Sequence, residues 1–382
     1  AGPWLRLSHL PPMRLGALRV MRAIQLPLLP EPESVLDRRD RGTSFHRLAS
    51  RSVLNPPAST RMGFWSINPY VGCEFGCSYC YARDTHRWVV ERAAARIEVE
   101  AVVAPPELAE LTELAPLDAF ERKIFVKTGA AEVLRRTLDP ARIGAVPIVI
   151  GSATDPYQPA ERQFQLTRQL LETLLPHQGL TIGIITKSAL VVRDLALLQQ
   201  LAARHRLRIN FSLASMDPAL IRKLEPRTPL PMVRLQALAR LTDAGLEAGL
   251  LLAPILPGIT DGWASLARVM ESARAAGAHF VSGIPLRLGP SARERFLEVL
   301  RREFPRLAPR YQEHFEGRTN ASRSYRHALA RRIRLLQEVH GFPVAPAPGG
   351  SGVRQRNEAP SPGPRRAASR PARLSRPANP AA

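Results

Sequence analysis

The three cysteines of this 382-residue chain, Cys73, Cys77 and Cys80, lie on one short stretch. Their C-x3-C-x2-C spacing places three thiolates together, and the chain has no fourth cysteine. Ferredoxin-type electron carriers bind all four irons of a cluster through cysteine. A four-iron cluster held by only three thiolates keeps one iron open to bind and activate another molecule. The spacing therefore predicts a catalytic iron–sulfur cluster.

A zinc site is the main alternative, with His86 as a fourth ligand beside the three cysteines. Structural zinc sites usually combine one C-x2–4-C pair with a second, distant pair of ligands, and this sequence offers no such second pair. The cysteines could also be core residues, because a free cysteine packs as a small hydrophobic side chain. Three of them in one stretch, flanked by glycines and tyrosines, argue against a core.

The composition indicates a basic protein of a reducing compartment. The chain carries 54 Lys and Arg against 33 Asp and Glu, a formal net charge of +21, which is compatible with nucleic acid or another anionic substrate. Residues 341–382 hold seven Arg and one Glu, so +6 of this charge lies in that tail. No apolar run reaches the roughly 18–20 residues of a membrane helix. Because the clustered cysteines have no others to pair with, we expect the cytoplasm and no membrane.

From residue 63 onward, short apolar runs alternate with amphipathic helical patterns. This alternation predicts an α/β fold in which buried parallel strands are joined by right-handed helical crossovers. Six units favour a partial (β/α)6 TIM-like barrel over a closed barrel of eight strands. The predicted strands are 63–68, 147–151, 180–186, 207–213, 248–254 and 279–285, and the predicted helices are 85–96, 158–175, 191–205, 231–244 and 263–276.

The chain divides into four predicted parts around this barrel. The barrel itself carries an insertion with a further possible strand at 123–127, and a helical extension closes its open side. Segments rich in Pro, Arg, Ala and Gly with few apolar anchors are expected to be disordered. The parts are a partly disordered N-terminal arm (1–58), the barrel (59–285, insertion 102–142), a C-terminal helical region (286–342) and a disordered Pro/Arg-rich tail (343–382).

Polar side chains stand at the ends of the predicted strands. The first strand runs into the cysteines, and the next three end at segments 151–157, 186–188 and 212–215. In parallel α/β folds, chemistry collects at the carboxyl ends of the strands. One such segment alone would be ordinary loop polarity or a helix cap. Four in register predict a single site at this edge of the sheet.

From residue 42 to about residue 285, the chain resembles the radical S-adenosylmethionine (radical SAM) proteins of the spore photoproduct lyase-like group, in particular an uncharacterised actinobacterial-type branch. The motifs that carry the resemblance are N-P-Y-V-G-C (68–73), C-S-Y-C-Y-A-R (77–83), T-D-P-Y-Q-P (154–159), I-T-K-S (185–188), E-P-R (225–227) and P-I-L-P-G (254–258). Together they are much more specific than the three cysteines.

The resemblance implies a [4Fe-4S] cluster on Cys73, Cys77 and Cys80, whose open iron chelates the amino and carboxylate groups of S-adenosylmethionine. A flavodoxin or ferredoxin would supply one electron, and the 5′-deoxyadenosyl radical would then abstract a substrate hydrogen. The family analogy, together with the basic charge, points first to a nucleic acid or a nucleotide as substrate, and a protein or a small molecule is the alternative substrate. A different class of function also fits the composition, namely a non-catalytic, zinc-stabilised, Arg-rich module that binds nucleic acid.

The adenine of the cofactor would lie against four side chains that the resemblance identifies. Tyr79, just before the last cysteine, matches the aromatic residue that contacts the adenine, and Tyr81 matches a neighbour that supports the same pocket. Pro254 and Ile255 match the wall on the other side.

The methionine part of the cofactor would be held at the ends of the next strands. A carboxylate at the second strand end suits an ammonium donor. Lys187 and Ser212 match positions that contact the methionine carboxylate or the ribose, and Arg227 is a second candidate for that carboxylate. The residues at the place that holds the amino group are Ser152, Thr154 and Asp155.

One departure from the family bears on the reaction. Spore photoproduct lyase uses a cysteine outside the cluster loop, near the second strand's end, as a hydrogen-atom donor. This chain has Ala153 near that place and no further cysteine. Repair of a thymine lesion by that route is therefore not expected, unless a tyrosine such as Tyr157 relays the hydrogen atom.

Overall fold

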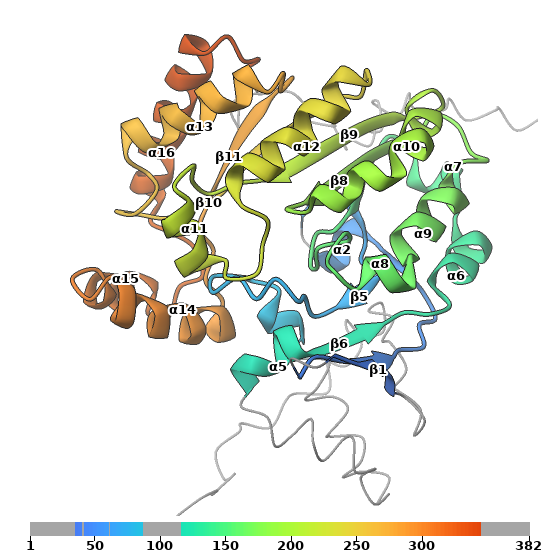
Figure 1. Ribbon diagram of the computed structural model, residues 1–382, viewed down its shortest axis with the longest axis horizontal. Helices are drawn as coiled ribbons and strands as arrows, with labels where there is room; N and C mark the ends of the chain where they lie inside the picture. The colour runs from blue at the N-terminus through green and yellow to red at the C-terminus, as the bar shows by residue number, and fades with distance from the viewer. Residues whose placement is uncertain (1–34, 40–41, 61, 87–115, 345–382) are drawn as a thin grey trace, which may run out of the picture. The chain divides into compact units, whose positions relative to one another are not determined.

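A sheet of parallel strands forms the centre of the molecule (Figure 1). The computed structural model describes residues 35–39, 42–60, 62–86 and 116–344. The strand order in this sheet is β11-β10-β9-β8-β7-β4-β3. The strands are β3 (Leu54–Asn55), β4 (Trp65–Ile67), β7 (Ile148–Ile150), β8 (Thr181–Thr186), β9 (Arg206–Ser212), β10 (Ala248–Ile255) and β11 (Val281–Pro285).

Neighbouring strands from β4 to β11 all pair in parallel and follow one another in chain order. Only β3 is antiparallel, with Leu54 opposite Ile67 of β4. The six predicted strands are thus present, and the partial (β/α)6 barrel is confirmed. Strands β7 and β10 are largely apolar and buried, as expected for strands covered on both faces. Strand β8 alternates buried with half-buried residues, and β9 begins with an alternation of exposed Arg206 and Arg208 with buried apolar residues.

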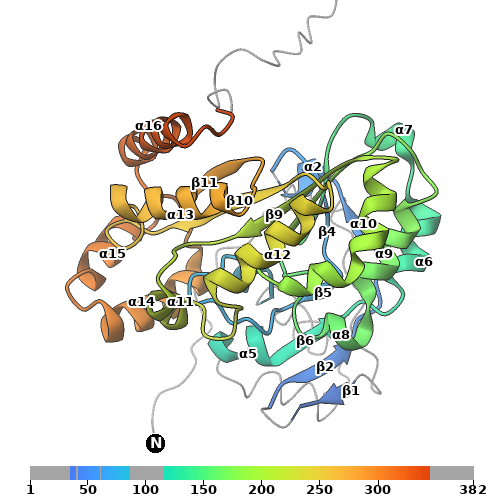
Figure 2. The same ribbon diagram turned by 45° about the horizontal axis from the view of Figure 1, so that its top comes forward.

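Helices cover the outer face of this sheet (Figures 1 and 2). The predicted helix at 158–175 is in fact two helices, because Gln165 has a left-handed backbone (φ 51°). The Glu161 carboxylate accepts hydrogen bonds from Thr167 N (2.9 Å) and Arg168 N (3.2 Å), so it caps a new helix start. The covering elements are α8 (Glu161–Phe164), α9 (Leu166–Leu174), η2 (Ala189–Asp194), α10 (Leu195–Ala202), α11 (Pro218–Leu224), α12 (Pro231–Asp243) and α13 (Trp263–Ala275).

A second, smaller sheet has the strand order β1-β2-β6-β5. It joins residues of the predicted N-terminal arm to the predicted insertion, since β2 runs parallel to β6 and β5 antiparallel to it. The predicted strand at 123–127 is β6; most of the predicted helix at 85–96 lies outside the described residues. The strands of this sheet are β1 (Val35–Arg38), β2 (Ser44–Arg47), β5 (Tyr70–Val71) and β6 (Lys123–Val126), and the helices in this part of the chain are α2 (Pro57–Thr60), α5 (Pro116–Arg122), α6 (Ala130–Thr137) and α7 (Pro140–Ile143).

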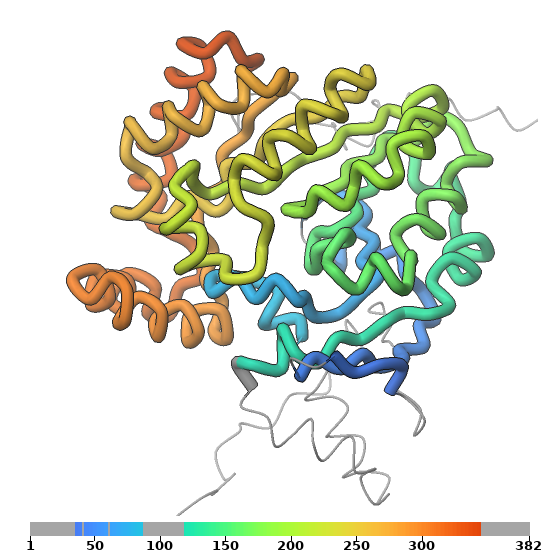
Figure 3. Tube along the Cα trace, viewed as in Figure 1, coloured from blue at the N-terminus to red at the C-terminus, as the bar shows by residue number. Residues whose placement is uncertain are grey.

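Three C-terminal helices complete the described structure (Figure 3): α14 (Pro290–Glu303), α15 (Ala308–Phe315) and α16 (Arg323–Val339). Helix α16 lies against β11, where Gln337 Nε2 donates to Val281 O (2.7 Å). Gly283 permits this approach, because a Cβ there would collide with Ile333. Helices α14 and α15 share a hydrophobic cluster with the cysteine residues. Among the described residues, no helix has the length and apolar character to cross a membrane.

Candidate functional site

One cavity lies where the segment with the three cysteines meets the carboxyl ends of the parallel strands. It contains about 980 Å³ of atom-free space, part of which is open to solvent. We call residues 72–81 the cysteine loop; in Figure 3 it belongs to the light-blue part of the tube. The predicted site residues that line the cavity are Cys73, Cys77, Cys80, Tyr79, Tyr81, Ser152, Thr154, Asp155, Lys187, Ser212 and Pro254.

The segment after β7 holds the cysteine loop in place. Thr154 Oγ1 donates to Gly72 O (2.7 Å), and Gln158 Nε2 donates to the same carbonyl (3.3 Å). Gln158 Oε1 in turn accepts from Glu74 N (2.9 Å). Gly72 has φ +90°, and a Cβ there would lie 2.8 Å from Phe120 O, so the loop requires glycine at this point. The T-D-P-Y-Q-P motif therefore acts partly as a clamp on the loop backbone.

The three thiols are held in an apolar environment. Cys73 and Cys77 are buried and Cys80 is half-buried, and none forms a disulfide. Burial raises the pKa of each thiol above its usual value. Because thiolates are the metal ligands, binding of a metal must release their protons. Arg83 Nη2 donates to Cys77 O (3.2 Å) and so adds positive charge behind the loop.

The donor set fits a cluster better than a single ion. All three thiols face one cavity, yet no group of three or more His, Cys, Asp or Glu side chains among the described residues is arranged to hold a metal ion. A mononuclear zinc site needs its ligands about 2.3 Å from one point. A four-iron cluster takes one thiolate per iron, so its ligands stand farther apart around the cluster.

Asp155 joins the end of β7 to the end of β8. Its Oδ1 accepts from Tyr157 N (2.9 Å) and Thr186 Oγ1 (2.7 Å), and its Oδ2 accepts from Lys187 N (2.7 Å). Since a carboxylate has about four acceptor positions, one position remains at Oδ2. Burial raises the pKa of Asp155 above its usual value, although the three hydrogen bonds oppose that rise.

Lys187 brings a positive charge into the cavity. Its Nζ donates to Ser212 Oγ (2.8 Å) and lies 5.9 Å from the centre of the Tyr79 ring. Ser212 Oγ in turn donates a hydrogen bond to Ala253 O (2.9 Å). Within the described ranges Lys187 forms no ion pair, so its charge remains available to an anionic group of a ligand.

Tyr79 is fixed from the far side of the loop by a buried ion pair. Its hydroxyl donates to Glu225 Oε1, and Glu225 Oε2 pairs with Arg234 Nη2. Both charged side chains are fully buried. Burial alone would raise the pKa of Glu225, but the charges of Arg234 and Lys187 hold it below its usual value. Arg234 also donates to Ser212 O (2.8 Å), so one network fixes Tyr79 and the end of β9.

Tyr81 closes the cavity from the other end of the loop. Its hydroxyl donates to Ser152 O, and burial raises its pKa to about 12. Asn68 holds the same strand end, because its Nδ2 donates to Ser152 Oγ (3.2 Å) and its Oδ1 accepts from Ala153 N (2.8 Å). The guanidinium of Arg287 lies 5.9 Å from the centre of the Tyr81 ring and also lines the cavity.

Two predicted cofactor contacts lie outside the cavity. Arg227 is 42% exposed on the outer face of the cysteine loop, with Nη2 3.7 Å from Glu121 Oε1. Ile255 is buried in the hydrophobic core of the barrel, near Gly283. Neither side chain lines the cavity.

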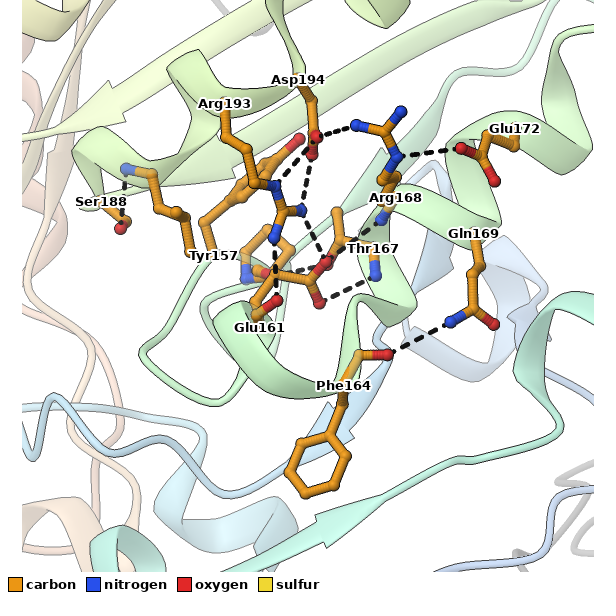
Figure 4. Close-up of polar contacts among 12 residues, drawn as sticks. Tyr157, Glu161, Phe164, Thr167, Arg168, Gln169, Glu172, Ser188, Arg193 and Asp194 are labelled. Atoms are coloured by element: carbon orange, nitrogen blue, oxygen red, sulfur yellow. Dashed lines mark hydrogen bonds and ion pairs between the residues drawn. The ribbon is translucent and has the colours of Figure 1, made fainter.

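Tyr157 also points away from the cavity. It is fully buried beside an ionic cluster formed by Glu161, Arg193 and Asp194 (Figure 4). Burial raises the pKa of Tyr157 well above its usual value, and the Asp194 and Glu161 charges add to this rise. The hypothesis that Tyr157 relays a hydrogen atom thus finds no support. The cluster instead ties α8 to η2, behind the segment that clamps the loop.

His86 is not placed to complete a zinc site. Its Nε2 donates to Lys123 O (2.9 Å), and its ring packs against Phe120 and Phe125. It does not line the cavity that the three cysteines share. Burial lowers the pKa of His86 to about 4. The structure therefore disfavours the zinc-stabilised alternative.

We predict that His86 makes the protein sensitive to acid. Its pKa is lower in the folded than in the unfolded state, where it is about 6.5, so its contribution is complete above pH 6.5 and is lost as pH falls toward 4. The loss should reach about 3 kcal/mol of unfolding free energy between pH 7 and pH 4. Urea unfolding of the wild type and of His86→Gln at both pH values measures it. A variant with the wild-type pH dependence, or one that loses bound metal, would contradict this assignment.

Sequence reasoning missed several residues that build the site. Gln158 lies within a recognised motif, but its role as a clamp depends on the distant Gly72 carbonyl. Arg234 is one of 50 arginines in the chain, and no sequence pattern distinguishes this buried arginine from the exposed ones. Arg287 follows the last strand, at the position where the other strand ends had indicated site residues. That position was the signal that could have identified it.

Comparisons with known proteins agree with this geometry. The family description "Radical SAM superfamily" matches residues 67–272, which is more than half of the chain. A spore photoproduct lyase complexed with dinucleoside spore photoproduct has the same fold, with a TM-score of 0.51 and 16% identity over 72% of this chain and 74% of that chain. The resemblance to that group is confirmed at the level of the fold.

Relatives by sequence come from bacteria, an archaeon and a virus. An uncharacterized protein of Mycobacterium tuberculosis is 31% identical over 325 residues, which are 85% of this chain and 84% of the relative. An uncharacterized protein of Methanocaldococcus jannaschii is 24% identical over 195 residues, 51% of this chain and 61% of the relative. The family match and the mycobacterial relative lead to one conclusion: the chain belongs to the radical SAM superfamily.

Proposed function

We propose that this protein is an enzyme that binds a [4Fe-4S] cluster through Cys73, Cys77 and Cys80 and uses S-adenosylmethionine to abstract a hydrogen atom from its substrate. Superfamily membership implies S-adenosylmethionine, an iron–sulfur cluster and an external electron donor. The observation that carries the proposal is the cavity where three thiols and the polar ends of β7, β8 and β9 meet. When bound, the two cofactors supply a carbon-centred radical through reductive cleavage of the sulfonium.

The chain's own residues would bind and orient the cofactor. The free acceptor position of Asp155 Oδ2 suits one N–H of the methionine ammonium. The Lys187 ammonium, which forms no ion pair with the described carboxylates, suits the methionine carboxylate. Tyr79 and Pro254 line the cavity and provide apolar surface for the adenine. Leu251 and Leu286 complete an inner wall that excludes water from a reactive intermediate.

Lys187→Met should weaken the binding of S-adenosylmethionine. A hydrogen bond to a charged group contributes about 1.5–3 kcal/mol, so we expect a dissociation constant about 10- to 100-fold higher. Equilibrium dialysis of cluster-loaded protein measures it. Lys223→Met is the matched control, because Lys223 lies on the surface and pairs with Glu303 (3.1 Å). Unchanged affinity in Lys187→Met would remove Lys187 from the proposed site.

An anionic substrate, in the first instance a nucleotide or nucleic acid, fits the mouth of the cavity. Arg287 is exposed there, and among the described residues no carboxylate pairs with it. The solved structure with the same fold is named as a complex with dinucleoside spore photoproduct. Ala153 lines the cavity, and the chain has no cysteine besides the three proposed cluster ligands to return a hydrogen atom. We therefore propose hydrogen abstraction without repair by a cysteine donor.

The proposal is tested by anaerobic purification and reconstitution with iron and sulfide. We expect four irons per chain and 5′-deoxyadenosine from S-adenosylmethionine when dithionite is added. A colourless protein that holds one zinc ion and binds nucleic acid would favour the non-catalytic module instead. Affinity for nucleic acid that falls steeply with salt would support that substrate class. Three free cysteines suit a reducing compartment, and we propose the cytoplasm.

A further inference from the structure

A second depression lies on the outer face of the cysteine loop. Residues from α8, α11 and the loop line it, among them Phe75, Arg162, Arg222 and Arg227. In Figure 1 the light-blue loop passes between α11 and α8. We call the three arginines together with Phe75 the arginine face. Nothing in the proposed chemistry uses these side chains.

The arginine face carries positive charge that its surroundings do not neutralise. Within the described ranges, no carboxylate pairs with Arg162 or Arg222, and both are exposed. Arg222 Nη1 donates only to backbone carbonyls, those of Pro226 (3.1 Å) and Thr228 (2.8 Å). A surface with such an excess of one charge attracts a partner of the opposite charge over long range.

The charge of Arg227 is only weakly neutralised, because its one ion pair among the described residues is long. Its Nη2 stands 3.7 Å from Glu121. Glu121 already pairs with Arg83 (2.8 Å) and with Arg295 (3.5 Å). The negative charge of Glu121 is therefore shared among three guanidinium groups.

Only the thickness of the cysteine loop separates the arginine face from the cavity. Phe75, between Cys73 and Cys77, lines both the depression and the cavity. The Arg227 guanidinium lies directly against the loop, because a Cβ on Gly76 would be 2.7 Å from Arg227 Nη2. This surface is thus immediately behind the three thiols. The exposed residues Tyr81, Ile284 and Arg287 line the cavity and do not line the depression, so the arginine face is separate from the mouth of the cavity.

We infer that the arginine face is the docking surface for the one-electron donor, an acidic carrier protein of the flavodoxin type. The inference rests on the proposed function, which requires an electron at the thiol-bound group. Charge complementarity selects an acidic partner, and the single loop between the surface and the thiols makes the path for the electron short. A nucleic-acid substrate has to reach the cavity instead, where hydrogen abstraction takes place.

Stopped-flow reduction of the reconstituted protein by reduced flavodoxin and by dithionite tests this inference. Arg162→Glu reverses a charge without removing an interaction that the structure shows, and Arg268→Glu, an exposed mid-helix position of α13, is the matched control. Electrostatic steering changes association rates by about 10- to 1,000-fold. We expect Arg162→Glu to slow reduction by flavodoxin at least about tenfold at low salt, with less effect at high salt and none with dithionite. The control should match the wild type.

The affinity of oxidised flavodoxin for each variant gives a second readout that does not need turnover. Weaker binding to Arg162→Glu and unchanged binding to Arg268→Glu would support the inference. Equal reduction rates and equal affinities in both variants would overturn it, as would a loss of DNA binding in Arg162→Glu without any effect on flavodoxin. If dithionite fails to reduce the wild type, the proposed function fails, and the flavodoxin affinities still decide the docking surface.

Discussion

Cys77→Ala should purify with little or no bound cluster and should form no 5′-deoxyadenosine from S-adenosylmethionine. Each thiolate holds one iron, and the chain has no spare cysteine to replace the one removed. The fold should survive, because Cys77 is one small side chain of a hydrophobic cluster that includes α14 and α15. Iron content, visible absorption and product formation under anaerobic conditions measure the effect.

Ser78→Ala is the control for this variant within the same loop. Ser78 Oγ donates to Leu224 O (3.1 Å) and does not line the cavity. The loss of a neutral hydrogen bond should cost about 1 kcal/mol of stability and leave the iron content unchanged. A Cys77→Ala protein that keeps its iron and still cleaves the cofactor would show that the thiols are not the cluster ligands.

Glu225→Gln should destabilise the protein by about 3–5 kcal/mol, because it breaks a fully buried ion pair and leaves a charge without a partner. Arg234 would keep its hydrogen bonds to Ser212 O and Pro229 O, but its charge would remain in an apolar interior. Tyr79 would lose the carboxylate that accepts from its hydroxyl. The free energy of urea unfolding measures the effect.

Two further variants make this test specific. Glu225→Gln combined with Arg234→Met should regain part of the lost stability, since no buried charge is then unpaired. Glu132→Gln on α6 removes an exposed partner of Arg135 and should change the stability by less than about 1 kcal/mol. If Glu225→Gln costs no more than Glu132→Gln, the buried pair does not hold the site together.

The parallel strands could be predicted because most of them are short apolar runs between turn residues, as expected for strands covered on both faces. The small second sheet could not be predicted in full, since β5 has two residues and its partner β6 lies more than fifty residues further along the chain. The break at Gln165 depends on the distant Arg193, which orients Glu161, the residue that caps α9. Local patterns carry no information about such partners.

For the site, strand ends and motifs were sufficient to indicate most of the cavity lining. Arg227 and Ile255 do not line the cavity, because a residue's place in a motif does not fix the side of the backbone on which it lies. The motifs also did not indicate Arg234, because its role in fixing Tyr79 depends on a buried ion pair with Glu225. Interactions between side chains far apart in sequence account for what the motifs left out.

The contact between α16 and β11 has a consequence for how the protein can be shortened. Strand β11 is an edge strand of its sheet. Gln337 donates a hydrogen bond to a carbonyl of β11, and Ile333 packs over Gly283. A chain that stopped after the last strand would present a bare row of peptide groups on which another copy could pair, and such rows promote aggregation. Helix α16 thus protects this edge of the sheet. We expect the barrel alone, produced without α16, to aggregate.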